Sequence, residues 1–254
     1  MDLYEAIFVR KSTRRFQSTA VDGGVLTGIG RYYEEVPRLV PGIATEIGIM
    51  DNTDGKHAPK GLLGVKAPYY LIIYSEKKDR YMMNAGFIME YLSLHLLTRG
   101  LGSCILGSVS VPKAIQDRGN KTFVMAMAFG FPKDSATRPQ FQARRIPMDK
   151  LCLFREDPGR QGRCLLEAAR LAPSSMNRQP WRFVAKKKAL HVFSTRKDLG
   201  NSDKMIEFDL GCMFAHVTIA AEELWLGIDT IRLENISQNH FKSTDYVMSV
   251  LLED

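Results

Sequence analysis

Residues 172–183 read Ala172-Pro173-Ser174-Ser175-Met176-Asn177-Arg178-Gln179-Pro180-Trp181-Arg182-Phe183. The residues before them, 165–171, are good helix formers, and Pro173 ends that helix because its ring cannot continue the hydrogen-bond ladder. Beyond the stretch, residues 183–184 and 190–193 predict two short strands, and we expect Trp181 and Phe183 to be buried. The stretch is therefore predicted to be a loop between a helix and a strand.

This loop is rich in short polar side chains, with hydroxyls at Ser174 and Ser175 and amides at Asn177 and Gln179. Such groups donate and accept hydrogen bonds over a short range, which suits the polar edge of a ligand. Serine and asparagine are also favoured in turns for purely local reasons. From the loop alone, a capped turn is the simpler interpretation and a ligand site is the alternative.

The composition is that of a globular protein. The chain has 254 residues, 45% of them hydrophobic and 25% charged, which suits one large domain or two modest ones. It has no apolar run of about 18 residues, and its acidic first residues do not resemble a signal peptide. The four cysteines are scattered without a Cys-x-x-Cys pair, and the five histidines are not paired at metal-ligand spacing. We therefore expect a cytoplasmic protein without a metal site or a disulfide framework.

The net charge of +7 is compatible with nucleic-acid binding. However, the densest basic cluster, residues 10–15, is short and has a hydroxyl at its centre. A single bound phosphate explains this cluster as well as a polyanion does. A nucleic-acid binder is kept as an alternative, but it does not explain the loop at residues 173–181.

Periodicity predicts a succession of helices and strands along the chain. The helices are expected over residues 3–9, 25–36, 80–98, 165–171 and 205–224. The strands are expected over residues 67–74, 104–107, 123–131, 183–184, 190–193 and 246–248. Residues 37–64 are rich in glycine and proline, and part of them is expected to be an exposed loop.

The order of elements recurs after residue 150. Adding 125 to the residue number maps Asn84 onto Asp209 and Gly86 onto Gly211. The shared order of helix, glycine turn and closing strand favours a tandem repeat, with a first half over residues 1–150 and a second half over residues 151–254. Any two amphipathic helices share a period, so a chance match is the alternative.

The candidate polar groups are divided between the two halves. The first half holds the basic cluster and the pair Arg144-Arg145, and the second half holds the loop at 173–179. The counterpart of the loop, near residues 39–43, lacks hydroxyls and amides, and the counterpart of the basic cluster, near residues 153–157, carries two acids. Each half is therefore expected to hold one portion of a single site.

These motifs resemble those of the FMN-dependent nitroreductase family. The family's basic pair, followed by serine, one residue and a further basic residue, matches residues 10–14, with Phe16 one place late. Its pattern Ala-Pro-Ser, two residues, Asn, one residue, Gln-Pro-Trp matches residues 172–181. Its Gly-Leu-Gly, a small residue and Cys match residues 100–104, and its basic tail after the last strand is similar to residues 144–147. The motifs span nearly the whole chain.

The resemblance implies an α+β, nitroreductase-like fold of two tandem α/β repeats, with sheets that contain antiparallel strands and are flanked by helices. In the family, two identical subunits build two FMN sites at their interface, and each site takes the basic motif from one subunit and the Ser-Asn loop from the other. Here both portions lie on one polypeptide, so the chain resembles the fused, single-chain members of the family. We expect a monomer that acts as an intramolecular pseudo-dimer with one of two sites lost, and further association stays open.

The resemblance also implies which residues bind FMN. The arginines of the basic motif and tail would neutralise the phosphate, because a guanidinium meets phosphate oxygens in pairs, and Ser12 would donate to it. Lys11 would lie along the pyrimidine edge, the loop would contact the ribityl chain and ring edge, and backbone N–H groups of residues 106–108 would face N5 and O4. A solvated tail is the alternative for Arg144 and Arg145. The expected cofactor-binding residues are Arg10, Lys11, Ser12, Arg14, Leu106, Gly107, Ser108, Arg144, Arg145, Pro173, Ser174, Ser175, Asn177 and Gln179.

The implied activity is an FMN-dependent oxidoreduction in a ping-pong cycle. NADH or NADPH would reduce FMN at N5 and leave, and a nitroaromatic, a quinone or a similar acceptor would then take the electrons. No side chain is expected to act as a catalytic acid or nucleophile, because the flavin performs the hydride transfer and the protein supplies binding, orientation and electrostatics. The alternative is an FMN-binding storage or sensor module without turnover.

Overall fold

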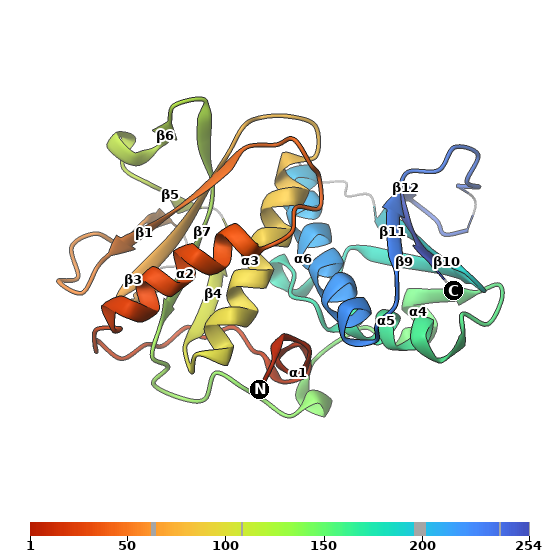
Figure 1. The fold of residues 1–254 in the computed structure, drawn as a ribbon, viewed down its shortest axis with the longest axis horizontal. Helices are drawn as coiled ribbons and strands as arrows, with labels where there is room; N and C mark the ends of the chain where they lie inside the picture. Colours follow the sequence, from red (N-terminus) through yellow and green to blue (C-terminus); the bar gives the residue numbers. More distant parts are fainter. Residues whose placement is uncertain (62–64, 108, 196–201, 239, 254) are drawn as a thin grey trace.

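The computed structural model describes residues 1–61, 65–107, 109–195, 202–238 and 240–253 (Figure 1). The α-helices are α1 (Leu3–Val9), α2 (Gly23–Glu35), α3 (Tyr81–Thr98), α4 (Met148–Leu151), α5 (Gly159–Leu171) and α6 (Ser202–Glu223). The strands are β1 (Thr45–Asp51), β2 (Lys60–Gly61), β3 (Tyr69–Ser75), β4 (Gly102–Leu106), β5 (Val109–Ser110), β6 (Asp117–Arg118), β7 (Lys121–Gly130), β8 (Cys152–Phe154), β9 (Trp181–Lys186), β10 (Ala189–Thr195), β11 (Ile228–Ile231) and β12 (Thr244–Leu252).

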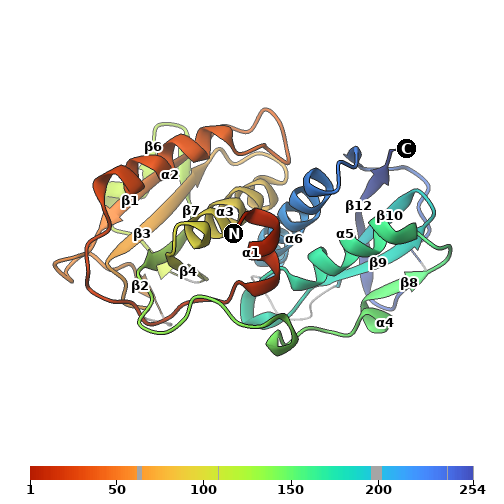
Figure 2. The ribbon, with the colours of Figure 1, turned by 60° about the horizontal axis from the view of Figure 1, so that its bottom comes forward.

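The longer strands form two sheets that lie on opposite sides of the central helices α3 and α6 (Figures 1 and 2). The first sheet has the order β1-β3-β7-β4, with β6 also paired to β7, and the second has the order β11-β12-β10-β9-β8. All of these pairs are antiparallel except β8 with β9, which are parallel. The first sheet draws on residues 45–130 and the second on residues 152–252. The predicted mixture of helices with largely antiparallel sheets is confirmed.

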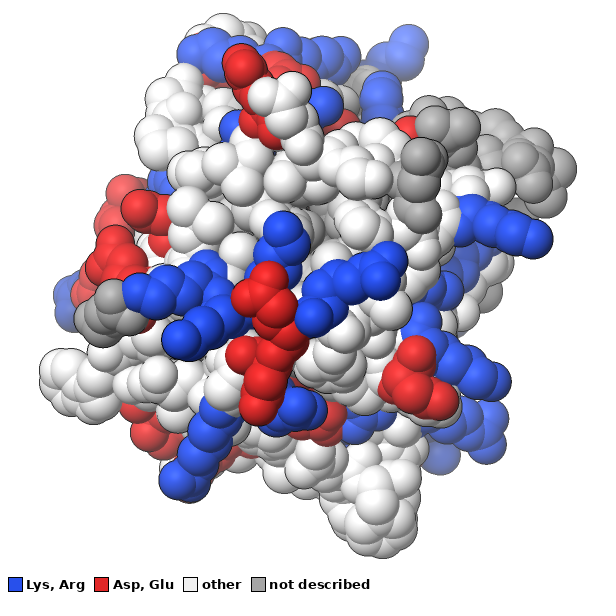
Figure 3. Space-filling view, turned by 90° about the vertical axis from the view of Figure 1, so that its right-hand side faces the viewer, with Lys and Arg blue, Asp and Glu red and all other residues white. Residues whose placement is uncertain are grey.

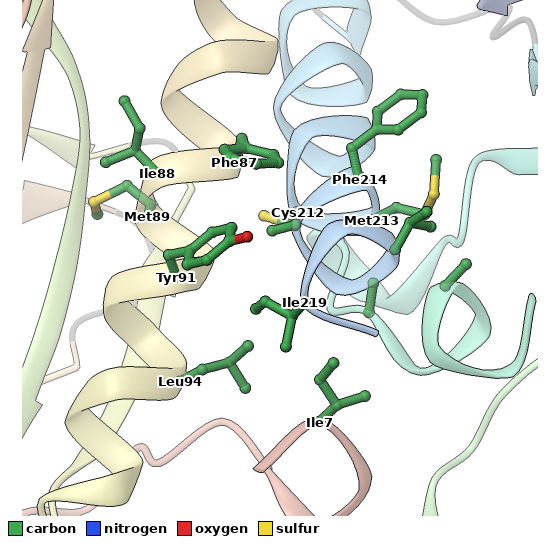
Figure 4. Packing of buried hydrophobic residues seen from close by; sticks show 14 of the residues in the cluster. Ile7, Phe87, Ile88, Met89, Tyr91, Leu94, Cys212, Met213, Phe214 and Ile219 are labelled. Atoms are coloured by element: carbon green, nitrogen blue, oxygen red, sulfur yellow. The ribbon is translucent and has the colours of Figure 1, made fainter. Parts of the chain in front are cut away.

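Helices α3 and α6 pack directly against each other and form the centre of the core. Phe87 and Tyr91 of α3 point toward Cys212 and Ile219 of α6, and Ile7 of α1 lies beside them (Figure 4). Every residue of α3 from Met82 to Leu97 is buried, as expected of a helix that is apolar on all sides. The helices can approach closely because a glycine lies on each side of the crossing: a Cβ on Gly86 would lie 2.0 Å from the carbonyl oxygen of Phe208.

Most predicted elements are present. The helix expected over residues 3–9 has those bounds, and the strand predicted from residue 67 is observed as β3 with every residue buried. Trp181 and Phe183 are in the core, as predicted. β1, which lies within residues 37–64, was not predicted from the sequence, and neither were the short elements α4, β2, β5, β6, β8 and β11. The division of the chain at residue 150 and the tandem repeat stay predictions.

The surface over the second sheet carries charges of both signs. Lys and Arg side chains are interspersed with Asp and Glu on this face (Figure 3). Within the part of the chain that the structure describes, none of the helices combines the length and the hydropathy of a membrane-spanning segment.

Candidate functional site

The basic segment follows α1 directly and is held between β4 and the chain that follows β7. The backbone N–H of Lys11 donates to the carbonyl of Ala136 over 3.1 Å, and that of Thr13 donates to the carbonyl of Ser103 over 2.8 Å. Thr13 packs so tightly on Gly102 that a Cβ at residue 102 would lie 2.3 Å from the Thr13 hydroxyl oxygen. The glycine of the Gly-Leu-Gly motif is therefore required here as the surface on which the basic segment rests.

Within this segment, Arg10 is buried and Arg14 is exposed. Nε of Arg10 lies 3.4 Å from Oε1 of Glu90, a fully buried residue of α3. Both arginines lie near Cys104 of β4: burial raises the pKa of this thiol, and the positive charges of Arg14 and Arg10 partly oppose that shift. Lys11 and Ser12, between them, are half-buried.

Two further arginines lie close to Arg10. Arg138 donates from Nη1 to the backbone carbonyl of Arg10. Burial, and next the positive charges of Arg10 and Arg138, lower the pKa of Arg145 to about 10. Burial and Arg10 likewise lower the pKa of Arg138. These shifts indicate that like charges are crowded in a half-buried space, where a bound anion would relieve their repulsion.

The loop at residues 173–179 is shaped by strained backbone and by hydrogen bonds within the protein. Met176, Asn177 and Gln179 have φ angles of 53°, 56° and 49°, which L-residues adopt only rarely. The Ser174 hydroxyl accepts from the backbone N–H of Gln179 over 2.8 Å. Strain of this kind persists only where surrounding contacts enforce it, and it is common at ligand sites.

A carboxylate of α6 anchors the start of this loop. The backbone N–H of Ser175 donates to both carboxylate oxygens of Asp209, each over 3.0 Å. In the first half, the N–H of Val40 donates in the same way to Oδ1 of Asn84 over 3.1 Å. Val40 lies in the segment that the sequence analysis named as the counterpart of the loop, and it brings no hydroxyl there.

The predicted basic tail, residues 144–147, is hydrogen-bonded to the C-terminal end of the loop. Nη1 of Arg145 donates to Oδ1 of Asn177 over 2.9 Å, and Nδ2 of Asn177 donates to the carbonyl of Arg144 over 2.9 Å. The backbone N–H of Ile146 donates to Oε1 of Gln179 over 2.8 Å. Nε of Arg145 is buried and has no hydrogen-bond partner among the described residues.

The end of β4 approaches the same loop from the first half. A Cβ on Gly107 would lie 4.0 Å from Oγ of Ser175 and 3.6 Å from the terminal methyl of Met205 in α6, which are ordinary contact distances. Leu106 is buried beside it. Ser108, the third predicted residue of this segment, lies outside the described residues.

The structure thus gathers predicted residues from distant parts of the chain. Arg10, Arg145 and the loop lie together, and Gly107 approaches the loop from just beyond the end of β4. Pro173 and Ser174 are half-buried at the entrance to the loop, and Arg144 is exposed and takes part through its carbonyl. Asn177 and Gln179 use their side chains to hold the loop to the tail, a role that the sequence analysis did not foresee.

Three functional candidates were missed: Glu90, His216 and Arg138. Glu90 and His216 are ionisable residues within mostly apolar stretches of α3 and α6, and that contrast was the available signal. For Arg138 the sequence offered no comparable pattern. Among the described residues, no group of three or more His, Cys, Asp or Glu side chains could hold a metal ion.

A phosphate dianion fits the cationic cluster by charge. Arg10, Arg138 and Arg145 are close enough to repel one another. The carboxylate of Glu90 contacts Arg10, but it also contacts His216. The cluster therefore keeps an excess of positive charge, with guanidinium groups that suit phosphate oxygens. Gly107 has no side chain of its own, so its backbone is the part of this segment that a planar ligand beside the loop would meet.

A family model described as "Putative TM nitroreductase" matches residues 2–221 of this chain. A solved structure from Thermotoga maritima MSB8, described as a "putative nitroreductase", is similar at 20% identity with a TM-score of 0.62, and the match covers 99% of this chain and 93% of that one. A nitroreductase family protein from Clostridium difficile 630 is 16% identical with a TM-score of 0.49, over 59% of this chain and 96% of that one. None of the curated proteins matches. The likeness to the Thermotoga structure shows that the chain has the nitroreductase-like fold.

Proposed function

The chain belongs to the nitroreductase family of that model, and from this premise we propose that it is an FMN-dependent oxidoreductase that takes electrons from NADH or NADPH. Family membership supports an oxidoreductase of the nitroreductase type. The cofactor, the electron donor and the acceptor are the proposed part. A nitroaromatic, a quinone or a similar small molecule is the acceptor that we propose.

One observation carries the proposal: the basic tail and the loop at 173–179 are joined by the hydrogen bond of 2.9 Å between Arg145 and Asn177. Arg10 acts electrostatically on the same Arg145. Three of the four motifs of the resemblance, the basic segment, the tail and the loop, therefore lie beside one cluster of positive charge. A patch used only for solubility would have no need of the strained loop.

Different residues of the chain would bind different parts of FMN. Arg10, Arg14 and Arg145 would hold the phosphate together with Ser12, and Arg138 would add to the same charge. Ser174, Ser175 and the N–H groups near Gly107 would contact the ribityl chain and the ring, while Lys11 would lie along the ring's edge. When bound, FMN supplies hydride transfer at its N5 atom, and the protein's share is to bind and orient the reactants.

We propose a single site for each chain. The contact of Val40 with Asn84 repeats that of Ser175 with Asp209, but the counterpart loop lacks the hydroxyls and the amide. A pseudo-dimer within one chain, with one working site, explains this asymmetry. The free cysteines, of which Cys104, Cys152 and Cys212 are buried, support a reducing compartment such as the cytoplasm.

Absorbance spectroscopy of the purified, FMN-reconstituted protein tests the proposal. We expect a flavin band equivalent to one FMN per chain that bleaches when NADH or NADPH is added without oxygen, and returns when a quinone or nitroaromatic is added. A protein that cannot be reconstituted with FMN contradicts the proposal. A protein that holds FMN but is not reduced by either nicotinamide is instead a storage or sensor module.

A further inference from the structure

Arg10 contacts a buried carboxylate, which in turn contacts a buried histidine. Glu90 of α3 and His216 of α6 both have side chains that are 0% exposed, and Nε2 of His216 lies 2.9 Å from Oε1 of Glu90. The same Oε1 lies 3.4 Å from Nε of Arg10, whose side chain is 7% exposed. The contact therefore ties the end of α1 to both central helices.

The hydrogen bonds of His216 determine where its protons lie. Nδ1 of His216 is 2.9 Å from the carbonyl oxygen of Ala168, which can only accept, so Nδ1 carries a proton. Nε2 faces Glu90, and a hydrogen bond over 2.9 Å needs one proton between the two groups. Whichever group holds that proton, Glu90 and His216 together are neutral.

This neutrality matters for Arg10. A lone carboxylate beside Arg10 would cancel its charge, whereas a carboxylate paired with His216 orients the guanidinium and leaves the positive charge of the cluster in place. The contact with Glu90 is made by Nε of Arg10, and the two Nη atoms are the donors that can bind phosphate oxygens in pairs.

We infer that Glu90 and His216 are a positioning pair that holds Arg10 in the orientation for binding the phosphate of the flavin. The inference rests on the proposed function, because it assumes that a phosphate-bearing flavin is the ligand. Stability alone gives little reason for such a group, since desolvation largely offsets the attraction within a buried ion pair.

The test compares FMN with riboflavin, which has the same ring and ribityl chain but lacks the phosphate. Dissociation constants for both are measured by fluorescence titration of the full, flavin-free chain. We expect Glu90→Gln to weaken FMN binding about tenfold, the loss of roughly one charge-assisted hydrogen bond, and to leave riboflavin binding unchanged. In an Arg10→Gln background, Glu90→Gln should cause no further loss, because Glu90 acts through Arg10.

Two controls make the outcome specific. Glu46→Gln removes a carboxylate of β1, which pairs with Arg118 of β6 and Lys121 of β7. This change should alter neither dissociation constant. His216→Gln keeps an N–H donor toward Glu90 but cannot share a proton with it, so it should weaken FMN binding and leave riboflavin binding unchanged. His216→Leu removes the donor as well and should weaken FMN binding at least as strongly. If Glu90→Gln does not fold, as judged by circular dichroism, the two His216 variants decide the question.

The measurements distinguish failure of the proposed function from failure of the positioning pair. A wild-type chain that binds neither flavin overturns the proposed function. A chain that binds both, but in which Glu90→Gln and His216→Leu weaken both equally or neither, overturns the positioning pair alone.

Discussion

Gly86 of α3 and Gly211 of α6 each make room for the backbone of the other's helix. A Cβ on Gly86 would lie 2.0 Å from the carbonyl oxygen of Phe208, and a Cβ on Gly211 would lie 2.0 Å from that of Met83. Gly86 and Met83 are each 125 positions before Gly211 and Phe208. The contact is therefore reciprocal, as a two-fold axis between the helices requires, and it supports the predicted tandem repeat.

This crossing predicts a large loss of stability on adding a single methyl group. Gly86→Ala and Gly211→Ala should each lower the free energy of unfolding by about 1–3 kcal/mol or more, because the obstructing atoms are backbone and cannot rotate away. Urea denaturation measures the effect. Gly28→Ala, in α2, is the matched control: apart from the neighbouring residues and backbone of its own helix, no atom lies within 4 Å of its added Cβ, and the change should raise stability by up to about 1 kcal/mol. Equal effects at residues 28 and 86 would show that the helices do not cross at Gly86.

Gly102, the first residue of β4, and Gly107, the residue just after it, should respond differently to substitution. Gly107→Ala places its Cβ at least 3.6 Å from its neighbours, so the melting temperature should not change. If the flavin approaches this backbone as proposed, the same methyl group should weaken FMN binding about tenfold, because it would occupy the position of the flavin ring next to the backbone. Gly102→Ala, whose Cβ would meet Thr13 at 2.3 Å, should instead lower the melting temperature. Full FMN affinity in Gly107→Ala would place the ring away from β4.

Asp209 is predicted to hold the loop at 173–179 in its strained form. Asp209→Ala removes the acceptor for the Ser175 N–H and should cost about 1–2 kcal/mol of stability, with a weaker affinity for FMN. Asn84→Ala is the control in the other half, because it removes the matching contact with Val40. It should reduce stability without changing FMN affinity, as measured by thermal unfolding and flavin titration. Loss of FMN affinity in Asn84→Ala would argue for a second working site.

His95 predicts a pH dependence of stability. Burial, and next the charge of Arg99, lowers its pKa from 6.5 to about 4, and its ring stacks on Tyr32 with centroids 3.9 Å apart. The neutral ring is favoured in the fold, so its contribution is complete above pH 6.5 and is lost as the pH falls toward 4. Between pH 7 and pH 5, His95→Phe should remove about 2 kcal/mol of the pH dependence of unfolding while keeping an aromatic stack. Urea denaturation at the two pH values checks this, and parallel losses in both proteins would contradict it.

Local signals in the sequence were sufficient for most elements. Pro173 ends α5 because its ring acts on the residues next to it, and Gly100, with φ of +76°, closes α3 for an equally local reason. The apolar runs of β3 and α3 required burial wherever they were placed. β1 could not be found in this way, because none of its positions is fully buried and its register depends on pairing with β3.

The sequence by itself determined which residue types were available for a site: a basic segment at 10–15, a hydroxyl and amide loop at 173–179, and a basic tail at 144–145. Only the tertiary structure decided that Asn177 and Gln179 hold this loop to the tail, that Arg138 joins the arginines, and that Glu90 meets His216 across 126 positions of the chain. The physical reason is that a side chain's type is a property of one residue, whereas its partner depends on how α3 and α6 cross. That crossing is set by packing between distant segments, which no local pattern contains.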